Sequence, residues 1–153
     1  MCRLGCPVGM VALLGLAMMV GGCASGSNSL LQNPNKDLRK HRKEFVADAA
    51  TRSYPTTAPS VATSPIRGEV DYQIDVINLV NLSDTEWKDV EVWVNGRYVC
   101  SLTTLPAKKQ VGINFGSLFD NQGLAAPQQG VWVEKVEVLY NGSLRKATMH
   151  PAD

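Results

Sequence analysis

The chain contains little of the chemistry that enzymes and metal sites use, because only two of its 153 residues are histidine and only four are cysteine. His41 lies in a basic segment and His150 lies beside Pro151 near the C-terminus, so neither has a sequence-local partner for base catalysis. The sequence holds no nucleophile elbow, zinc-binding helix motif or phosphate-binding glycine loop. It therefore predicts a non-enzymatic protein without a metal or a cofactor.

The chain also lacks a strong charge of one sign, since 15 basic and 14 acidic residues give a net charge of +1. This balance argues against nucleic acid as a partner, because nucleic-acid-binding domains need an excess of positive charge. Hydrophobic residues make up 44% and charged residues 19%, which is ordinary globular composition. The length predicts a single folded domain.

The apolar run from Val8 to Val20 is too short to be a permanent membrane span, because it has thirteen residues and a bilayer-spanning helix needs about 20. With Arg3 before it and small residues behind it, the run predicts a secretory signal. It ends in Val20-Gly21-Gly22-Cys23. This ending resembles the lipobox of bacterial lipoproteins, in which an apolar residue and two small residues precede an acylated cysteine.

The lipoprotein resemblance implies that residues 1–22 are removed as a signal peptide and that Cys23 becomes a lipidated N-terminus. It implies a membrane anchor in the cell envelope, and Ala24 and Ser25, with no aspartate there, imply the outer membrane. The alternative is a plain secretory signal in which Cys23 is incidental. On the lipoprotein reading Cys100 is the only thiol left, so no intramolecular disulfide can form.

Residues 23–67 are expected to form a linker that is mostly disordered, with a short helix within 35–50. Seven basic and three acidic residues occur over 24–67, whereas 68–153 has seven basic and eleven acidic residues. The part from 51 onward is rich in Pro, Ser and Thr and predicts an extended chain. Such a tether would connect the lipidated N-terminus to the folded domain.

Four residues form the basic centre of this tether, namely Arg39, Lys40, Arg42 and Lys43. One interpretation is contact with anionic lipid headgroups or an anionic wall polymer, because basic residues near such a surface strengthen binding. The other interpretation is a solvated helix face that acts as a solubilising spacer.

Residues 68–153 show the alternation of apolar and polar residues that is typical of half-buried strands. One strand is expected from Val70 through Val80, others over 89–94, 97–102 and 111–115, a long one over 131–140, and a return strand over 144–149. Asn95-Gly96 and Asn141-Gly142 predict type I′ hairpins, because both central residues of that turn need positive φ. The fold class expected is all-β, an antiparallel β-sandwich of six or seven strands.

The hairpins and the stretch from Val76 to Val99 look like the immunoglobulin-like and fibronectin-type modules of bacterial envelope proteins. A strand that ends in Asn81-x-Ser83, followed by the W-x-x-V-x-V-x-V strand that starts at Trp87, is also weakly similar to FxLYD-type domains. These resemblances imply a binding module rather than a catalyst.

A two-residue turn at Asn95-Gly96 would set Val94 opposite Arg97 and Trp93 opposite Tyr98. If the valines of this hairpin face the core, Trp93, Tyr98 and Leu102 face outward and form a candidate surface for docking a protein or a sugar. Two alternatives are that the linker or another strand covers this cluster, or that the aromatic residues are core and the valines are half exposed.

Three further expectations concern single residues and one loop. Cys100 is expected to be a packed small hydrophobic residue, and Asp120-Asn121-Gln122-Gly123 to be a turn without calcium. The loop over 116–130 is long enough to be either a packed lid or a binding loop. Glu137 would lie opposite Lys146 across the second hairpin.

The sequence as a whole predicts a membrane-anchored envelope lipoprotein whose β-sandwich contacts another envelope protein. The alternative is a carbohydrate- or peptidoglycan-binding module that uses the same aromatic residues to stack on sugar rings.

Mass spectrometry of the amino-terminal peptide of the native protein tests the lipobox directly. We expect a peptide that begins at Cys23 and carries two or three acyl chains, which anchor stably because each buried methylene contributes about 0.8 kcal/mol. An unmodified peptide that retains the leader, or one cut elsewhere with a free thiol, would contradict this prediction.

Overall fold

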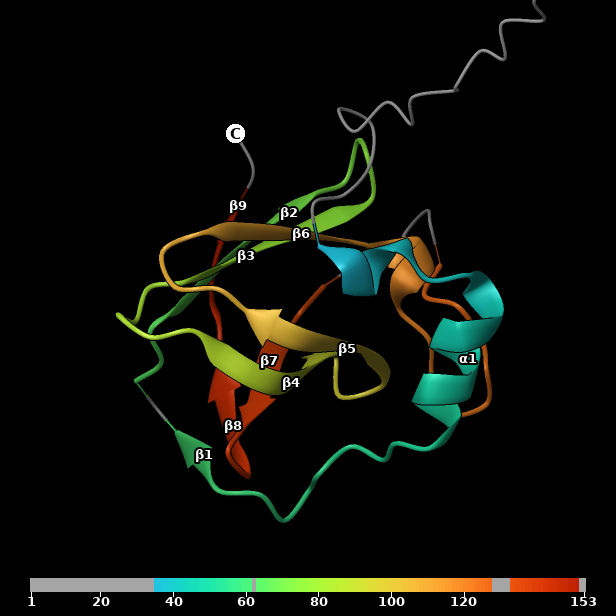
Figure 1. Ribbon diagram of the computed structural model, residues 1–153, viewed down its shortest axis with the longest axis horizontal. Helices are drawn as coiled ribbons and strands as arrows, with labels where there is room; N and C mark the ends of the chain where they lie inside the picture. The colour runs from blue at the N-terminus through green and yellow to red at the C-terminus, as the bar shows by residue number, and fades with distance from the viewer. Residues whose placement is uncertain (1–34, 62, 128–132, 152–153) are drawn as a thin grey trace, which may run out of the picture.

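The protein is a mostly β structure of two packed sheets with one short α-helix, shown as a computed structural model in Figure 1. The structure describes residues 35–61, 63–127 and 133–151. The predicted signal peptide (1–22) and Cys23 lie outside the described residues. The two sheets share one hydrophobic core, to which both contribute fully buried side chains.

The five-stranded sheet has the order β1-β8-β7-β4-β5, and the four-stranded sheet has the order β6-β3-β2-β9. The strands of the first sheet are β1 (Ser60–Val61), β4 (Trp87–Val94), β5 (Tyr98–Leu105), β7 (Val136–Tyr140) and β8 (Ser143–Lys146). Those of the second sheet are β2 (Ile66–Asp71), β3 (Val76–Asn81), β6 (Gln110–Asn114) and β9 (Thr148–Pro151).

The two packed sheets confirm the mostly β fold class. The prediction that all strands are antiparallel is wrong. β1 runs parallel to β8, and β2 runs parallel to β9. The described part of the chain has nine strands rather than six or seven, partly because the sequence segment 144–149 divides between the two sheets. The chain changes sheets at Ala147, whose buried position and N–H bond to the Val136 carbonyl (2.9 Å) fix the corner.

The single strand predicted from Val70 through Val80 is instead the hairpin β2–β3. The pairing runs from Asp71↔Val76 to Ile66↔Asn81. Tyr72 and Ile74 continue the alternation of the sequence, yet they lie in the turn and are exposed. Asp75 adopts a φ of 54°, which an aspartate tolerates in a turn. The apolar alternation from Val70 to Val80 therefore spans a chain reversal, and the two parts of the segment form separate strands.

Both Asn-Gly turns form as predicted, with positive φ at Asn95, Gly96, Asn141 and Gly142. The long strand expected over 131–140 is shorter, because β7 begins at Val136, and residues 128–132 lie outside the described residues.

The register of the first hairpin differs from the predicted register by one residue. Val94 pairs with Tyr98, and Trp93 pairs with Val99. Arg97 takes part in the turn, where its N–H bonds to the Val94 carbonyl (3.0 Å), and the ladder starts one residue later. Because side chains alternate between the faces of a sheet, this shift decides which residues share a face.

The segment predicted as a linker is largely folded onto the domain. It forms a 3₁₀ turn, η2 (Lys36–Arg39), and helix α1 (Arg42–Ala50), where one helix within 35–50 was expected. Phe45 and Ala49 of α1 are buried in the common core cluster. The folded region also begins before residue 68, since β1 and the first two residues of β2 precede that boundary.

Residues 51–59, which we call the strap, run from α1 to β1 (Figure 1). Helix α1 contacts β5 at one edge of the five-stranded sheet, and β1 pairs with β8 at the other edge. The strap therefore crosses from one edge of this sheet to the other. At its far end the Pro59 carbonyl accepts a hydrogen bond from the Leu144 N–H (2.9 Å).

Shortening the chain to residues 68–153 tests whether the strap belongs to the fold. The shortened chain would expose Trp93 and lose the Phe45 contacts, and burying a side chain of this size contributes about 1.5–3 kcal/mol. We expect its free energy of unfolding in urea to be lower by about 3 kcal/mol or more than that of residues 35–153. Equal stability of the two chains would show that the strap is an accessory.

Candidate functional site

The predicted docking surface of Trp93, Tyr98 and Leu102 is not exposed. The exposed fractions of these side chains are 2%, 9% and 1%. The observed register places Tyr98 opposite Val94 and Leu102 opposite Val90, so both share the face of the buried valines. Trp93 lies on the other face, opposite Val99. The three residues therefore form no common surface, and the prediction is wrong in this respect.

Trp93 is buried because the strap covers the outer face of the five-stranded sheet. The Tyr54 ring contacts the Trp93 indole edge to face, with the ring centroids 5.5 Å apart. The Trp93 Nε1–H donates to the Glu91 carboxylate (2.9 Å), so the buried indole nitrogen has its partner. This confirms the alternative in which the linker covers the aromatic residue.

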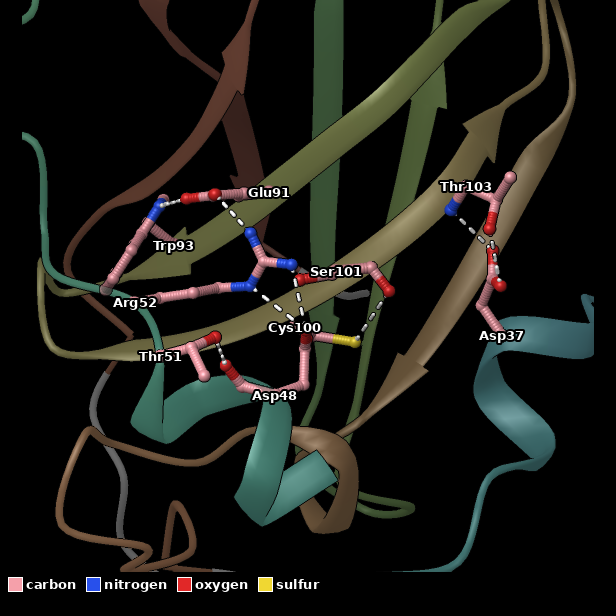
Figure 2. Close-up of polar contacts among 9 residues, drawn as sticks. All are labelled: Asp37, Asp48, Thr51, Arg52, Glu91, Trp93, Cys100, Ser101 and Thr103. Carbon is pink, nitrogen blue, oxygen red and sulfur yellow. Dashed lines mark hydrogen bonds and ion pairs between the residues drawn. The ribbon is translucent and has the colours of Figure 1, made fainter. Parts of the chain in front are cut away.

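An ionic network joins α1 and the strap to β4 (Figure 2). The Arg52 guanidinium pairs with Asp48 one helical turn earlier (2.8 Å) and with Glu91 on β4. Their side chains are 27%, 27% and 19% exposed, so the network is partly shielded from water. Burial by itself raises the pKa of Asp48, but the hydrogen bonds and charge of Arg52 outweigh it and hold that pKa below its usual value.

A second polar cluster holds the middle of the strap. The Tyr54 hydroxyl donates to Glu137 on β7 (2.7 Å), and Lys135 donates to the Tyr54 oxygen (3.0 Å). Lys135 also pairs with Glu137 (3.0 Å), whose side chain is 8% exposed. The predicted register of Glu137 opposite Lys146 is confirmed, but the carboxylate binds Lys135 and Tyr54. These contacts raise the pKa of Lys135, first through the hydrogen bond to Tyr54.

The free edge of β5 is protected by two contacts. The Thr103 N–H (2.6 Å) and hydroxyl (2.9 Å) both donate to Asp37 of η2, which Figure 2 shows beside β5. Val99 exchanges two backbone hydrogen bonds with Phe119. Exposed strand edges tend to pair with other chains, so these contacts oppose edge-to-edge association.

The described part of the loop, residues 116–127, packs against the domain. Leu118 and Phe119 are buried, and Phe119 stacks on Phe45 of α1 at 6.4 Å between ring centroids. Asp120 accepts the N–H groups of Gln122 and Leu124 and pairs with Arg97 (2.9 Å), so it shapes a turn as predicted. This portion fits the packed interpretation of the loop.

Cys100 is buried, whereas both histidines are exposed. Cys100 is 1% exposed, and burial raises the pKa of its thiol to about 12, which confirms a packed hydrophobic residue. His41 is the N-cap of α1 and is exposed, and His150 is exposed on β9. Over residues 35–61, 63–127 and 133–151, no three histidine, cysteine or acidic residues lie close enough to hold a metal ion.

The basic residues of the predicted tether lie together on a folded element. Five exposed basic residues lie on η2, on α1 or between them, namely Lys36, Arg39, Lys40, Arg42 and Lys43. We call these five residues the basic cluster. In the described part of the chain, none of the three lysines forms an ion pair with a carboxylate.

The open face of the molecule is the outer side of the four-stranded sheet. A groove of about 510 Å³ runs over it, and we call it the polar groove. Its lining comes from all four strands, with a guanidinium, a carboxylate, two amides and an imidazole among the side chains: Arg67, Gly68, Glu69, Asn78, Val80, Gln110 and His150. Arg67, Glu69, Gln110 and His150 are exposed and can reach a ligand.

A second hollow of about 740 Å³ lies between η2, β5 and β6. It is larger than the polar groove, but Lys36 and Asp37 at its rim belong to the segment that leads to the N-terminus. Its carboxylate, that of Asp37, already accepts two hydrogen bonds from Thr103. For this reason we regard the polar groove as the better candidate for binding.

Sequence reasoning missed the residues of the polar groove and of the strap contacts. The signal for Arg67 and Glu69 was their alternation with Ile66, Gly68 and Val70, which the predicted boundary between the linker (23–67) and the domain (68–153) divided. Tyr54 stood in a Pro/Ser/Thr-rich stretch that suggested an extended chain. No local signal joins Arg52 to Glu91, which is 39 residues away.

Comparisons with protein-family models, with curated proteins and with solved structures found no significant match to this chain. Within the described residues, no helix is long and apolar enough to cross a membrane.

A double-mutant cycle of Arg52→Met and Glu91→Gln measures the network that holds the strap. Arg52→Met removes the cation that both carboxylates share, and Glu91→Gln leaves Arg52 paired with Asp48 alone, so we expect each change to lower the free energy of unfolding by about 1–2 kcal/mol. The coupling energy should be about 0.5–1 kcal/mol.

The matched control is the cycle of Lys88→Met and Glu86→Gln, an exposed pair at 3.6 Å with side chains 70% and 53% exposed. Its coupling should be close to zero. Similar coupling in the two cycles would mean that the Arg52 network adds nothing beyond a surface ion pair.

Proposed function

We propose that the protein is a lipid-anchored envelope lipoprotein whose domain is a non-catalytic module for contact with another envelope protein. The lipobox-like Val20-Gly21-Gly22-Cys23 supports the anchor, and the placement outside the cytoplasm follows from it. We also propose that the domain is of the immunoglobulin- and fibronectin-like kind. Its two packed sheets and its Asn-Gly hairpins support that assignment.

The observation that carries the binding role is the polar groove on the outer face of the four-stranded sheet. The strap covers the outer face of the other sheet and buries Trp93 there. Over the four-stranded sheet the described chain leaves a concave surface to which all four strands contribute polar side chains. A rigid scaffold that holds several donors and acceptors around one hollow is the usual form of a binding site.

Glu69 and Arg67 place opposite charges at neighbouring positions of the polar groove, and Val80 adds an apolar contact. Protein interfaces combine polar groups of both signs with apolar area in this way. A protein partner therefore fits the groove well.

A carbohydrate is the second candidate ligand, and the two amides and the imidazole of the polar groove support it, because such groups hydrogen-bond sugar hydroxyls. The aromatic platform that the sequence suggested for sugar stacking is buried. Among the described residues, no phenylalanine, tyrosine or tryptophan lines the polar groove, so a sugar would bind there without stacking on one of them. This difference makes the protein partner the preferred proposal.

Site-specific photo-crosslinking in cells that make the protein tests the groove. A photoreactive phenylalanine analogue at Gln110 should give one discrete protein adduct, and the analogue at Lys88, exposed on β4, should give none. The charge reversal Arg67→Glu with Glu69→Lys should lower the adduct yield at least tenfold, because it alters both charged groups of the groove. Both residues are exposed, so the fold should persist.

Equal adducts from Gln110 and Lys88 would refute the groove as the contact site. Loss of the adduct on addition of purified peptidoglycan fragments, with no change on addition of a neutral glucan, would favour the carbohydrate alternative.

A further inference from the structure

We propose that the basic cluster is a membrane-contact site that holds one side of the domain against anionic phospholipid headgroups. The inference rests on the proposed lipid anchor, which would bring the cluster to the membrane. It adds an orientation to that proposal, because it names the side of the folded domain that faces the lipid.

The first observation is the concentration of charge in one short segment. From Lys36 to Lys43 the chain has five basic residues and one acidic residue, Asp37. That carboxylate accepts two hydrogen bonds from Thr103, and the next acid, Glu44, accepts the His41 N–H (2.6 Å). Both carboxylates are thus engaged within the domain, whereas the five basic residues are exposed, and the Arg42 guanidinium lies 5.6 Å from the centre of the Phe119 ring.

The second observation is that the cluster is attached rigidly to the domain. Asp37 fastens η2 to β5, and Phe45 and Ala49 bury α1 in the core. A charged patch on a flexible tether would bring the domain near a surface in any orientation. A patch on packed elements fixes which side of the domain meets the surface.

The third observation is that the charges of Arg42 and Lys43 do not stabilise the helix that carries them. Arg42 and Lys43 occupy the first turn of α1, and its last turn has no basic residue. The N-terminal end of a helix favours negative charge and disfavours positive charge. A solubilising spacer would gain nothing from this arrangement, whereas an external anionic surface would offset its unfavourable effect on the helix.

The fourth observation is the length of chain between the proposed anchor and the cluster. Lys36 follows Cys23 by 13 positions. A chain of that length spans at most about 45 Å when fully extended. The acyl chains would therefore keep the cluster close to the headgroups, where each basic residue strengthens binding by about fivefold. This short distance favours the membrane over a wall polymer farther away.

Co-sedimentation with lipid vesicles tests the proposal without the acyl chains. The chain from residue 23 with Cys23→Ser is mixed with phosphatidylcholine vesicles that contain either no phosphatidylglycerol or about 30% of it as the anionic lipid. We expect binding to the anionic vesicles alone, and weaker binding as salt shortens the screening length.

The decisive comparison uses two variants with the same change of charge. The cluster variant replaces four residues by glutamine, namely Arg39, Lys40, Arg42 and Lys43. The control variant replaces four exposed lysines elsewhere by glutamine, namely Lys88, Lys108, Lys109 and Lys146. The cluster variant should lose at least tenfold in vesicle affinity, and the control variant less than threefold. Circular dichroism and thermal unfolding should show that both remain folded.

Three results would overturn the proposal. The first is that the parent chain does not bind anionic vesicles, and the second is that the two folded variants lose equal vesicle affinity. The third is that sodium polyphosphate releases the protein from the vesicles at a phosphate concentration below that of the anionic lipid. The last result would identify a soluble anionic polymer as the better ligand. Because this assay needs neither acylation nor the polar groove, its failure would leave the lipid anchor and the partner contact standing.

Discussion

The contact between the strap and the outer face of the five-stranded sheet is the constraint on which the rest of the structure depends. Trp93 is too large and too apolar to face water, and Glu91 beside it needs a positive partner. Tyr54 covers the indole, and Arg52 supplies the charge. With that face closed, the described chain leaves the outer side of the four-stranded sheet as its open, concave face.

The same contact changes the meaning of the N-terminal segment. A disordered tether would separate the domain from the membrane and leave its orientation free. In the structure, η2, α1 and the strap belong to the folded domain, so the proposed tether is reduced to the short stretch between Cys23 and Asn35. The basic cluster and the polar groove then occupy fixed positions on one body, the cluster beside β5 and the groove on the sheet that does not contain β5.

Local chemistry explains which parts of the fold were predictable. The Asn-Gly turns follow from the positive φ that these residues tolerate, and the alternation over β6 follows from burial of one strand face. Cys100 follows the same pattern as a buried residue. The exposure of Tyr98 and Leu102 was mispredicted because a shift of one residue exchanges the faces of a strand, and no composition signal fixes such a shift. Trp93 lies on the predicted outer face, but the strap covers it.

The amino-acid sequence by itself determined the two Asn-Gly turns, the strands that flank them and the place where basic residues gather, because these depend on the φ preferences and polarity of neighbouring residues. Tertiary structure alone decided the hairpin register, the docking of the strap and the face left open. Arg52 and Glu91 are 39 residues apart, and Tyr54 and Glu137 are 83 residues apart. Contacts over such separations form only when the sheets have packed and removed water from both partners, so no local stretch of sequence contains them.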